Sequence, residues 1–128
     1  MLYTIHSNKN LNEIETALHE SAARNKFGIL ATHDLRETMK KKGVEFNSDC
    51  RIYEVCNPVQ AKRVLEANGA VSTALPCRIS VYAADGGYTI ATLLPTALMK
   101  MFGEAALEPV AQEVEQVIRA MMQEAADS

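Results

Sequence analysis

The sequence predicts an α+β fold, a two-layer sandwich in which helices cover one face of a five-stranded sheet. Three observations lead to this prediction: five short segments rich in strand-forming residues, a tight turn that joins two of them, and amphipathic helices near both ends of the chain. A doubly wound α/β fold is disfavoured. The hairpin interrupts the alternation of strands and helices, and no glycine-rich turn follows the first strand.

The chain begins with a predicted strand and an amphipathic helix. Residues 2–6 lean apolar and form the strand. The helix, residues 11–25, starts after Asn10, which has Glu13 three residues further on, the spacing of a capping box. Within the helix apolar residues recur at helical spacing, namely Leu11, Ile14, Leu18 and Ala22.

A second strand and a short helix follow. The apolar segment 27–32 is the predicted strand. Asp34 with Glu37 repeats the capping-box spacing and predicts a helix over 35–42. Gly43 suits the end of that helix, because glycine readily adopts the left-handed backbone conformation that stops a helix.

The centre of the chain carries two further strands around a helix. Residues 51–56 are rich in strand formers. Asn57 is a favourable N-cap and Pro58 suits the first helical position, so a helix begins there and ends at 68–69. The segment 77–82 alternates apolar and polar residues and is the fourth predicted strand.

The C-terminal third completes the sheet and supplies a long helix. A hairpin turn at 84–87 contains Asp-Gly-Gly, which tolerates positive φ, and 88–93 returns antiparallel. A short helix is predicted over 95–102 and a long one over 105–125. The long helix has one apolar stripe, formed by Leu107, Val110, Val114, Val117, Ile118 and Met121.

Composition indicates one globular domain, residues 1–128, and restricts its partners. The net charge is −3, which argues against nucleic-acid binding because a duplex-binding protein needs a cationic face. No segment approaches the ~20 apolar residues of a membrane span. Three cysteines, an odd number, and no apolar leader after Met1 favour free thiols and a cytoplasmic location.

Several short segments together carry a family likeness. They are Gly28-Ile29-Leu30, Asp34-Leu35 with Glu37, Cys56-Asn57-Pro58, Leu75-Pro76-Cys77, and Tyr82 with Asp85-Gly86-Gly87. With this spacing the chain resembles the domain of unknown function 302 family of small bacterial and archaeal proteins. The resemblance implies a mainly antiparallel sheet in β-α-β4-α order, of the TATA-binding-protein-like type with short inserted helices. It also implies a homodimer and no established activity, and this fold label carries no implication of DNA binding.

Two cysteines are the candidate reactive groups. Cys56 closes a strand just before a helix N-terminus, where the helix dipole can stabilise a thiolate. If strands 51–56 and 77–82 are antiparallel, Cys77 lies close to Cys56, and the pair suggests redox or sulfur chemistry. The alternative is that both thiols simply pack in the interior. Cys50 falls in the predicted loop and is expected to be the most exposed thiol. The cysteine spacing is not that of a zinc site, so neither a metal nor a cofactor is predicted.

Five residues are candidates for ligand binding. Asn57, Pro58 and Pro76 flank the two cysteines, and the Leu75-Pro76 bond is a candidate for the cis form. His33 and Asp34 stand together at a strand end, where a histidine beside a carboxylate can act as a base or ligand. The plainer interpretation is that Asp34 caps a helix and His33 lies at the surface.

Three functions follow from these observations. The first is a homodimeric binding module for a small ligand or a protein partner, favoured because the sequence contains no complete catalytic motif. The second is a thiol-based redox or sulfur-handling protein that uses Cys56 with Cys77. The third is a structural or regulatory dimer without a ligand. An enzymatic activity is not predicted, although the sequence leaves the question open.

Overall fold

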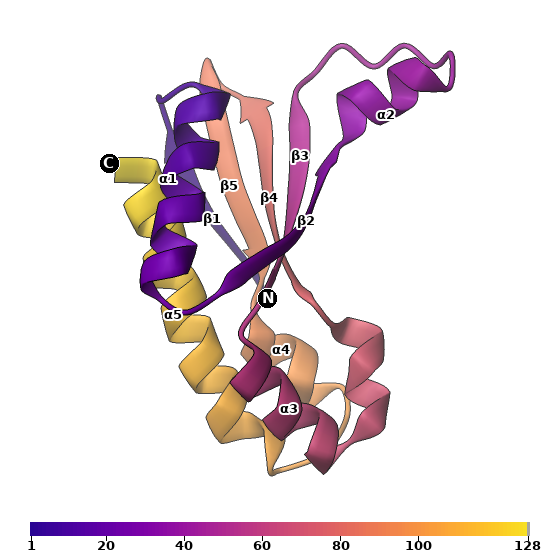
Figure 1. The fold of residues 1–128 in the computed structure, drawn as a ribbon, viewed down its shortest axis with the longest axis vertical. Helices are drawn as coiled ribbons and strands as arrows, with labels where there is room; N and C mark the ends of the chain where they lie inside the picture. The colour runs from indigo at the N-terminus through magenta and orange to yellow at the C-terminus, as the bar shows by residue number, and fades with distance from the viewer. Residues whose placement is uncertain (128) are drawn as a thin grey trace.

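The computed structural model describes residues 1–127 and contains one five-stranded sheet with helices on one side (Figure 1). The strands are β1 (Leu2–Ser7), β2 (Gly28–Asp34), β3 (Cys50–Cys56), β4 (Cys77–Ala84) and β5 (Gly87–Leu93). The helices are α1 (Leu11–Arg24), α2 (Leu35–Lys41), α3 (Pro58–Ala67), the 3₁₀ helix η1 (Gly69–Ala74), α4 (Pro95–Lys100) and α5 (Leu107–Asp127).

The sheet has the strand order β1-β5-β4-β3-β2, and every neighbouring pair is antiparallel. Helices α1 and α5 pack against each other and cover one face (Figure 1). The predicted α+β class, with helices on one face of a five-stranded antiparallel sheet, is therefore confirmed.

The main core fills the space between the sheet and helices α1 and α5. Side chains alternate along each strand, so one set of residues faces the helices and the next faces away. The largest fully buried side chains of this core are Ile14 and Leu18 from α1, Tyr53 and Val55 from β3, Ile79 and Val81 from β4, Ile90 from β5, and Ile118, Met121 and Met122 from α5. Of the apolar stripe predicted for the last helix, Val114, Val117, Ile118 and Met121 close this layer, whereas Leu107 and Val110 belong to a second core.

A second, smaller core lies at one end of the sheet, where α3, η1 and α4 gather around the N-terminal half of α5 (Figure 1). Its buried members are Val64, Val71, Met99, Leu107, Val110 and Ala111. Val114 packs against both cores. Helix α2 lies at the opposite end of the sheet, projects from the body and has no buried residue (Figure 1).

Local capping and turn signals determine several element boundaries as predicted. Asn10 and Glu13 form both hydrogen bonds of a capping box at α1. At the β4–β5 hairpin, Asp85 and Gly86 both have positive φ, of 50° and 76°, which matches the right-handed twist of the two strands.

Other boundaries differ from the sequence prediction, and for β2 and β3 the reason is strand pairing. Strand β2 continues past residue 32, because His33 and Asp34 pair with Ile52 and Arg51 of β3. Cys50 belongs to β3, where it pairs with Tyr82, and it is half-buried like the other cysteines, so its assignment to an exposed loop was wrong. Helix α4 ends at Lys100 and α5 begins at Leu107, each a turn or less from the prediction.

Among residues 1–127, no helix is long and apolar enough to span a bilayer.

Candidate functional site

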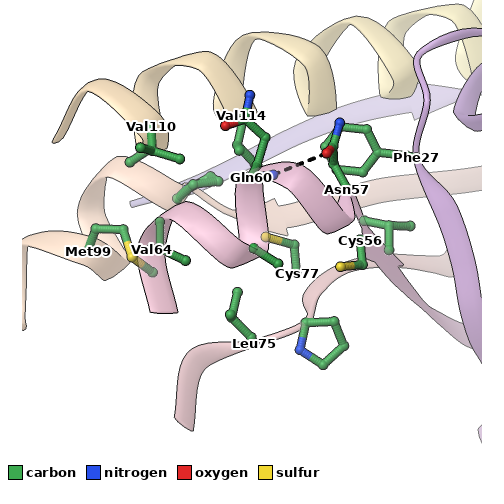
Figure 2. A pocket seen from close by; sticks show the side chains of 15 residues that line it. Phe27, Cys56, Asn57, Gln60, Val64, Leu75, Cys77, Met99, Val110 and Val114 are labelled. Atoms are coloured by element: carbon green, nitrogen blue, oxygen red, sulfur yellow. Dashed lines mark hydrogen bonds between the residues drawn. The ribbon is translucent and has the colours of Figure 1, made fainter. Parts of the chain in front are cut away.

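The candidate site is a pocket at the boundary between the two cores, beneath α3 (Figure 2). Its lining comes from separate parts of the chain: Phe27, Val55, Cys56, Asn57, Gln60, Ala61, Val64, Leu75, Pro76, Cys77, Pro95, Met99, Val110, Ala111 and Val114. The cavity volume is about 40 Å³, and the wall is almost entirely apolar. A space of this size and polarity suits a small apolar group more than it suits water, which needs polar partners.

The junction of β3 and α3 forms one wall. Cys56 ends the strand, and Asn57 caps the helix by accepting hydrogen bonds from the backbone N–H of Val59 at 3.0 Å and of Gln60 at 3.2 Å. Pro58 takes the first helical position, as predicted, but it is exposed and does not line the pocket.

The opposite wall is the segment Leu75-Pro76-Cys77, which leads from η1 into β4. The Leu75-Pro76 peptide bond is cis, a question that the sequence left open. Because β3 and β4 are antiparallel, with Val55 opposite Cys77, the end of one strand meets the beginning of the other. The predicted meeting of Cys56 and Cys77 at the same place is therefore confirmed, and both side chains line the pocket (Figure 2).

Burial makes both thiols weaker acids. It raises the pKa of Cys56 above its usual value, and it raises the pKa of Cys77 to about 11, with a further contribution from the nearby Cys56. This direction is opposite to the low thiol pKa that a nucleophilic or redox cysteine requires. Cys56 is therefore a weaker acid than usual although it directly precedes the N-cap of α3.

His33 and Asp34 do not belong to this site. They lie at the other end of β2, since β2 begins at Gly28 opposite Cys56. The His33 Nε2 atom is 3.0 Å from Glu54 Oε1 at the surface. Asp34 accepts a hydrogen bond from the Glu37 backbone N–H and so caps α2, as the plainer interpretation held.

A polar network that the sequence analysis missed lies beside α1, near the α2 end of the sheet. The Tyr53 hydroxyl donates a 2.9 Å hydrogen bond to Glu15, and Arg51 contacts Glu15 at 3.2 Å and Asp34 at 3.6 Å. Arg51 and Tyr53 are alternate residues of β3 that point toward the helices, a pattern that a strand assignment alone can predict. These charges satisfy one another, which favours a structural role.

The sequence analysis also missed the apolar part of the pocket. Val64, Val110 and Val114 occupy apolar helix positions of the kind that signal burial in general. Nothing in their spacing indicates that they border a cavity.

Comparisons with known proteins agree on the family. The family described as Domain of unknown function DUF302 matches residues 3–125. A crystal structure of an uncharacterised conserved DUF302 protein from Bacillus stearothermophilus is similar to this chain, with 34% sequence identity, a TM-score of 0.92 and 97% of each chain covered. No curated protein matches the chain. The resemblance drawn from the cysteine, proline and glycine segments is thereby confirmed, and the chain belongs to the DUF302 family.

Proposed function

We propose that this protein is a binding module whose pocket receives one small apolar group of a ligand or partner. The observation that carries the proposal is the apolar pocket between the two cores. The only titratable side chains in its lining are those of Cys56 and Cys77, and burial raises the pKa of both. Groups that stay protonated near neutral pH favour binding over nucleophilic chemistry.

The size of the pocket limits the bound group. Its volume of about 40 Å³ is well below the roughly 150 Å³ of a cavity that binds benzene. A methyl, ethyl or similar short group fits, and the rest of the ligand lies outside. Asn57 is among the lining residues, and no hydrogen bond to another described residue engages its side-chain amino group. That amino group is a suitable donor to a polar atom that follows the apolar group.

Short-chain amides test this proposal, because each has an apolar tail and a carbonyl acceptor. We expect propionamide and butyramide to shift the methyl NMR signals of Val64, Val110 and Val114 in a saturable manner. Ligands of five or six heavy atoms gain at most about 1.5 kcal/mol per atom, so their affinity is micromolar at best, and the titration extends into the millimolar range.

Two substitutions on α3 provide the matched comparison. Ala61 lines the pocket, whereas Ala67 lies on the same helix and does not. Ala61→Leu is expected to abolish the amide-dependent shifts and Ala67→Leu to retain them. Methyl signals that do not respond in the wild-type protein, or that respond equally in Ala61→Leu, would contradict the proposal.

We also propose that the module is a homodimer, joined through the uncovered face of the sheet. On this face Arg78 lies 3.8 Å from Glu54, and its side chain is 67% exposed, so the guanidinium is only loosely engaged. A two-fold axis between the two residues would set Arg78 of each copy against the other copy's Glu54. Such a charge arrangement is self-complementary, as an isologous interface requires.

Sedimentation equilibrium tests the dimer. Arg78→Glu places like charges across the proposed interface and is expected to shift the protein toward monomer. Lys62→Glu, on the exposed surface of α3, is the control and should leave the association unchanged. A wild-type protein that sediments as a monomer at 0.1 mM would refute this part of the proposal, as would an Arg78→Glu variant that remains dimeric.

A further inference from the structure

A second and larger concavity lies where β4 begins and β5 ends, and we call it the η1–α4 groove. Its volume of about 360 Å³ is within the range of roughly 300–1,000 Å³ that is typical of small-molecule sites. The lining residues are Thr73 and Ala74 from η1, Leu75, Pro76, Cys77 and Arg78 from the segment that begins β4, Leu93 from the end of β5, and Leu98, Met101 and Phe102 from α4 and the turn after it.

The wall of the η1–α4 groove is mostly apolar and partly open to solvent. Leu93 and Met101 are 48% and 74% exposed, and both border the groove. Leu98 and Phe102 are half-buried and pack against the smaller core, which holds this side of the groove in place. Single exposed apolar side chains are ordinary on a protein surface, but several around one concavity are typical of a site that binds an apolar ligand.

One cation borders the groove, and most of its hydrogen-bond donors are free. Arg78 is the only charged residue of the lining. Ser80 pairs with Ala91, and two residues further along each strand the same register brings Arg78 beside Leu93 on one face of the sheet. The Nε atom of Arg78 is 3.8 Å from Glu54, and within residues 1–127 no hydrogen bond or ion pair engages its two Nη atoms.

We propose that the η1–α4 groove binds an aliphatic carboxylate of medium chain length. The chain lies against Leu93, Leu98 and Met101, and the carboxylate accepts hydrogen bonds from the Nη atoms of Arg78. A guanidinium suits this role because it can donate two parallel N–H bonds to the two oxygens of a carboxylate. The inference goes beyond the proposed function, because it assigns a second site to a ligand that carries a charge.

The acidic neighbour of Arg78 leaves room for this ligand. Glu54 also contacts the Nε2 atom of His33, at 3.0 Å, and its longer contact with Arg78 is on the Nε edge of the guanidinium. The two Nη atoms form another edge, which is where the ligand binds. An arginine has five N–H donors, so a contact with the partner's Glu54 in the proposed dimer does not exhaust them.

Octanoate and octan-1-ol test the inference in parallel titrations, because they share the aliphatic chain and differ in charge. We expect both to shift the methyl NMR signals of Leu93, Leu98 and Met101 in a saturable manner. Arg78→Gln should lower the ratio of octanoate affinity to octanol affinity by about fivefold or more. Lys100→Gln removes a cation of α4 that does not line the groove, and it should leave this ratio unchanged.

A matched pair of substitutions in η1 tests where the chain binds. The hydroxyl groups of Ser72 and Thr73 both donate 2.8 Å hydrogen bonds to backbone carbonyls three residues earlier, and both residues are exposed. Only Thr73 lines the groove. Thr73→Trp should therefore abolish the octanoate-dependent shifts, and Ser72→Trp should retain them. Ala61→Leu, which fills the pocket of the candidate site, should retain them as well.

Four results would overturn the inference. They are the absence of saturable octanoate shifts in the wild-type protein, an unchanged affinity ratio in Arg78→Gln, equal octanoate responses in Thr73→Trp and Ser72→Trp, and loss of the response in Ala61→Leu. The first needs no variant, so a variant that fails to fold does not protect the inference. Amide-dependent shifts without an octanoate response would remove only the groove site, and an octanoate response without amide-dependent shifts would remove only the proposed function.

Discussion

Slow alkylation of Cys77 in the folded protein is the most direct consequence of the pocket's apolar wall. Burial raises the pKa of this thiol from 9.0 to about 11. Only the thiolate reacts, and each pKa unit changes the thiolate fraction tenfold in this range. At pH 8 the fraction therefore falls from about 10% to about 0.1%. We expect native Cys77 to alkylate about 100-fold more slowly than the same residue in the unfolded chain.

The assay compares iodoacetamide labelling of each cysteine in native protein and in concentrated urea. The protein is reduced and metal-free, and mass spectrometry of peptides gives the three rates. Cys56 should also be slower in the folded state, since burial raises its pKa as well. Native rates for Cys56 or Cys77 that equal or exceed the unfolded rates would refute the reasoning and would favour the thiol-chemistry hypothesis.

The same pKa shift has a consequence for stability. A raised pKa means that folding favours the neutral thiol, so the stabilisation is complete below the unfolded pKa, near 9, and is lost as the pH rises through about 11. Two pKa units correspond to about 3 kcal/mol. Urea unfolding at pH 7.5 and 10.5 should therefore show a larger loss for the wild type than for Cys77→Ala. Parallel losses in the two proteins would contradict this expectation.

Four further substitutions test other parts of the structure. Asn57→Ala removes the α3 cap and should cost about 1 kcal/mol in urea unfolding, so an unchanged midpoint would contradict the capping role. Ile118→Ala empties a fully buried position between α5 and the sheet and should lower the free energy of unfolding by roughly 2–5 kcal/mol. A loss well below that range would mean that the layers repack around the smaller side chain. Tyr88→Phe removes the 2.8 Å hydrogen bond that the Tyr88 hydroxyl donates to Asp49, which is the main cause of the lowered pKa of Asp49. An NMR titration should therefore show the pKa of Asp49 rising in this variant. An unchanged pKa would refute this cause. Ala61→Leu fills the pocket and should leave stability unchanged or raise the melting temperature slightly, whereas a large loss would mean that no space is available.

Features that depend on neighbouring residues were predictable from the sequence. The capping box of Asn10 and Glu13, the Asn57-Pro58 helix start and the Asp85-Gly86 turn all depend on chemistry within four residues. That the end of β3 with Cys56 meets the beginning of β4 with Cys77 was also predictable, because it requires only two strand assignments and an antiparallel orientation.

Features that depend on distant partners were not predictable. His33 and Asp34 are polar and read as the end of a strand, yet pairing with β3 keeps them in β2. The segment Gly69–Ala74 has no apolar period, and its 3₁₀ helix follows from the Asn68 cap and the packing of Val71 in the second core. The contribution of Val110 and Val114 to the pocket depends on where α5 crosses α3, which no local pattern encodes.

The position of the pocket follows from the presence of two cores. Phe27, Val55 and Cys77 belong to or pack against the main core, Val64 and Met99 belong to the smaller one, and all five line the cavity. Each core can reach close packing on its own, but the boundary between them must satisfy both sets of side chains at once, and small residues there leave space. At about 24 cal/mol per Å³, a closed void of 40 Å³ would cost about 1 kcal/mol, which is the upper value for a pocket that a ligand enters from outside. A leucine in place of Ala61 on α3 would recover much of that energy, so the alanine is better explained by the need for an open pocket than by the needs of the fold. The alanine at position 61 thus connects the pocket with binding independently of the thiols, and the opposite effects expected for Ala61→Leu on stability and on amide binding test this connection directly.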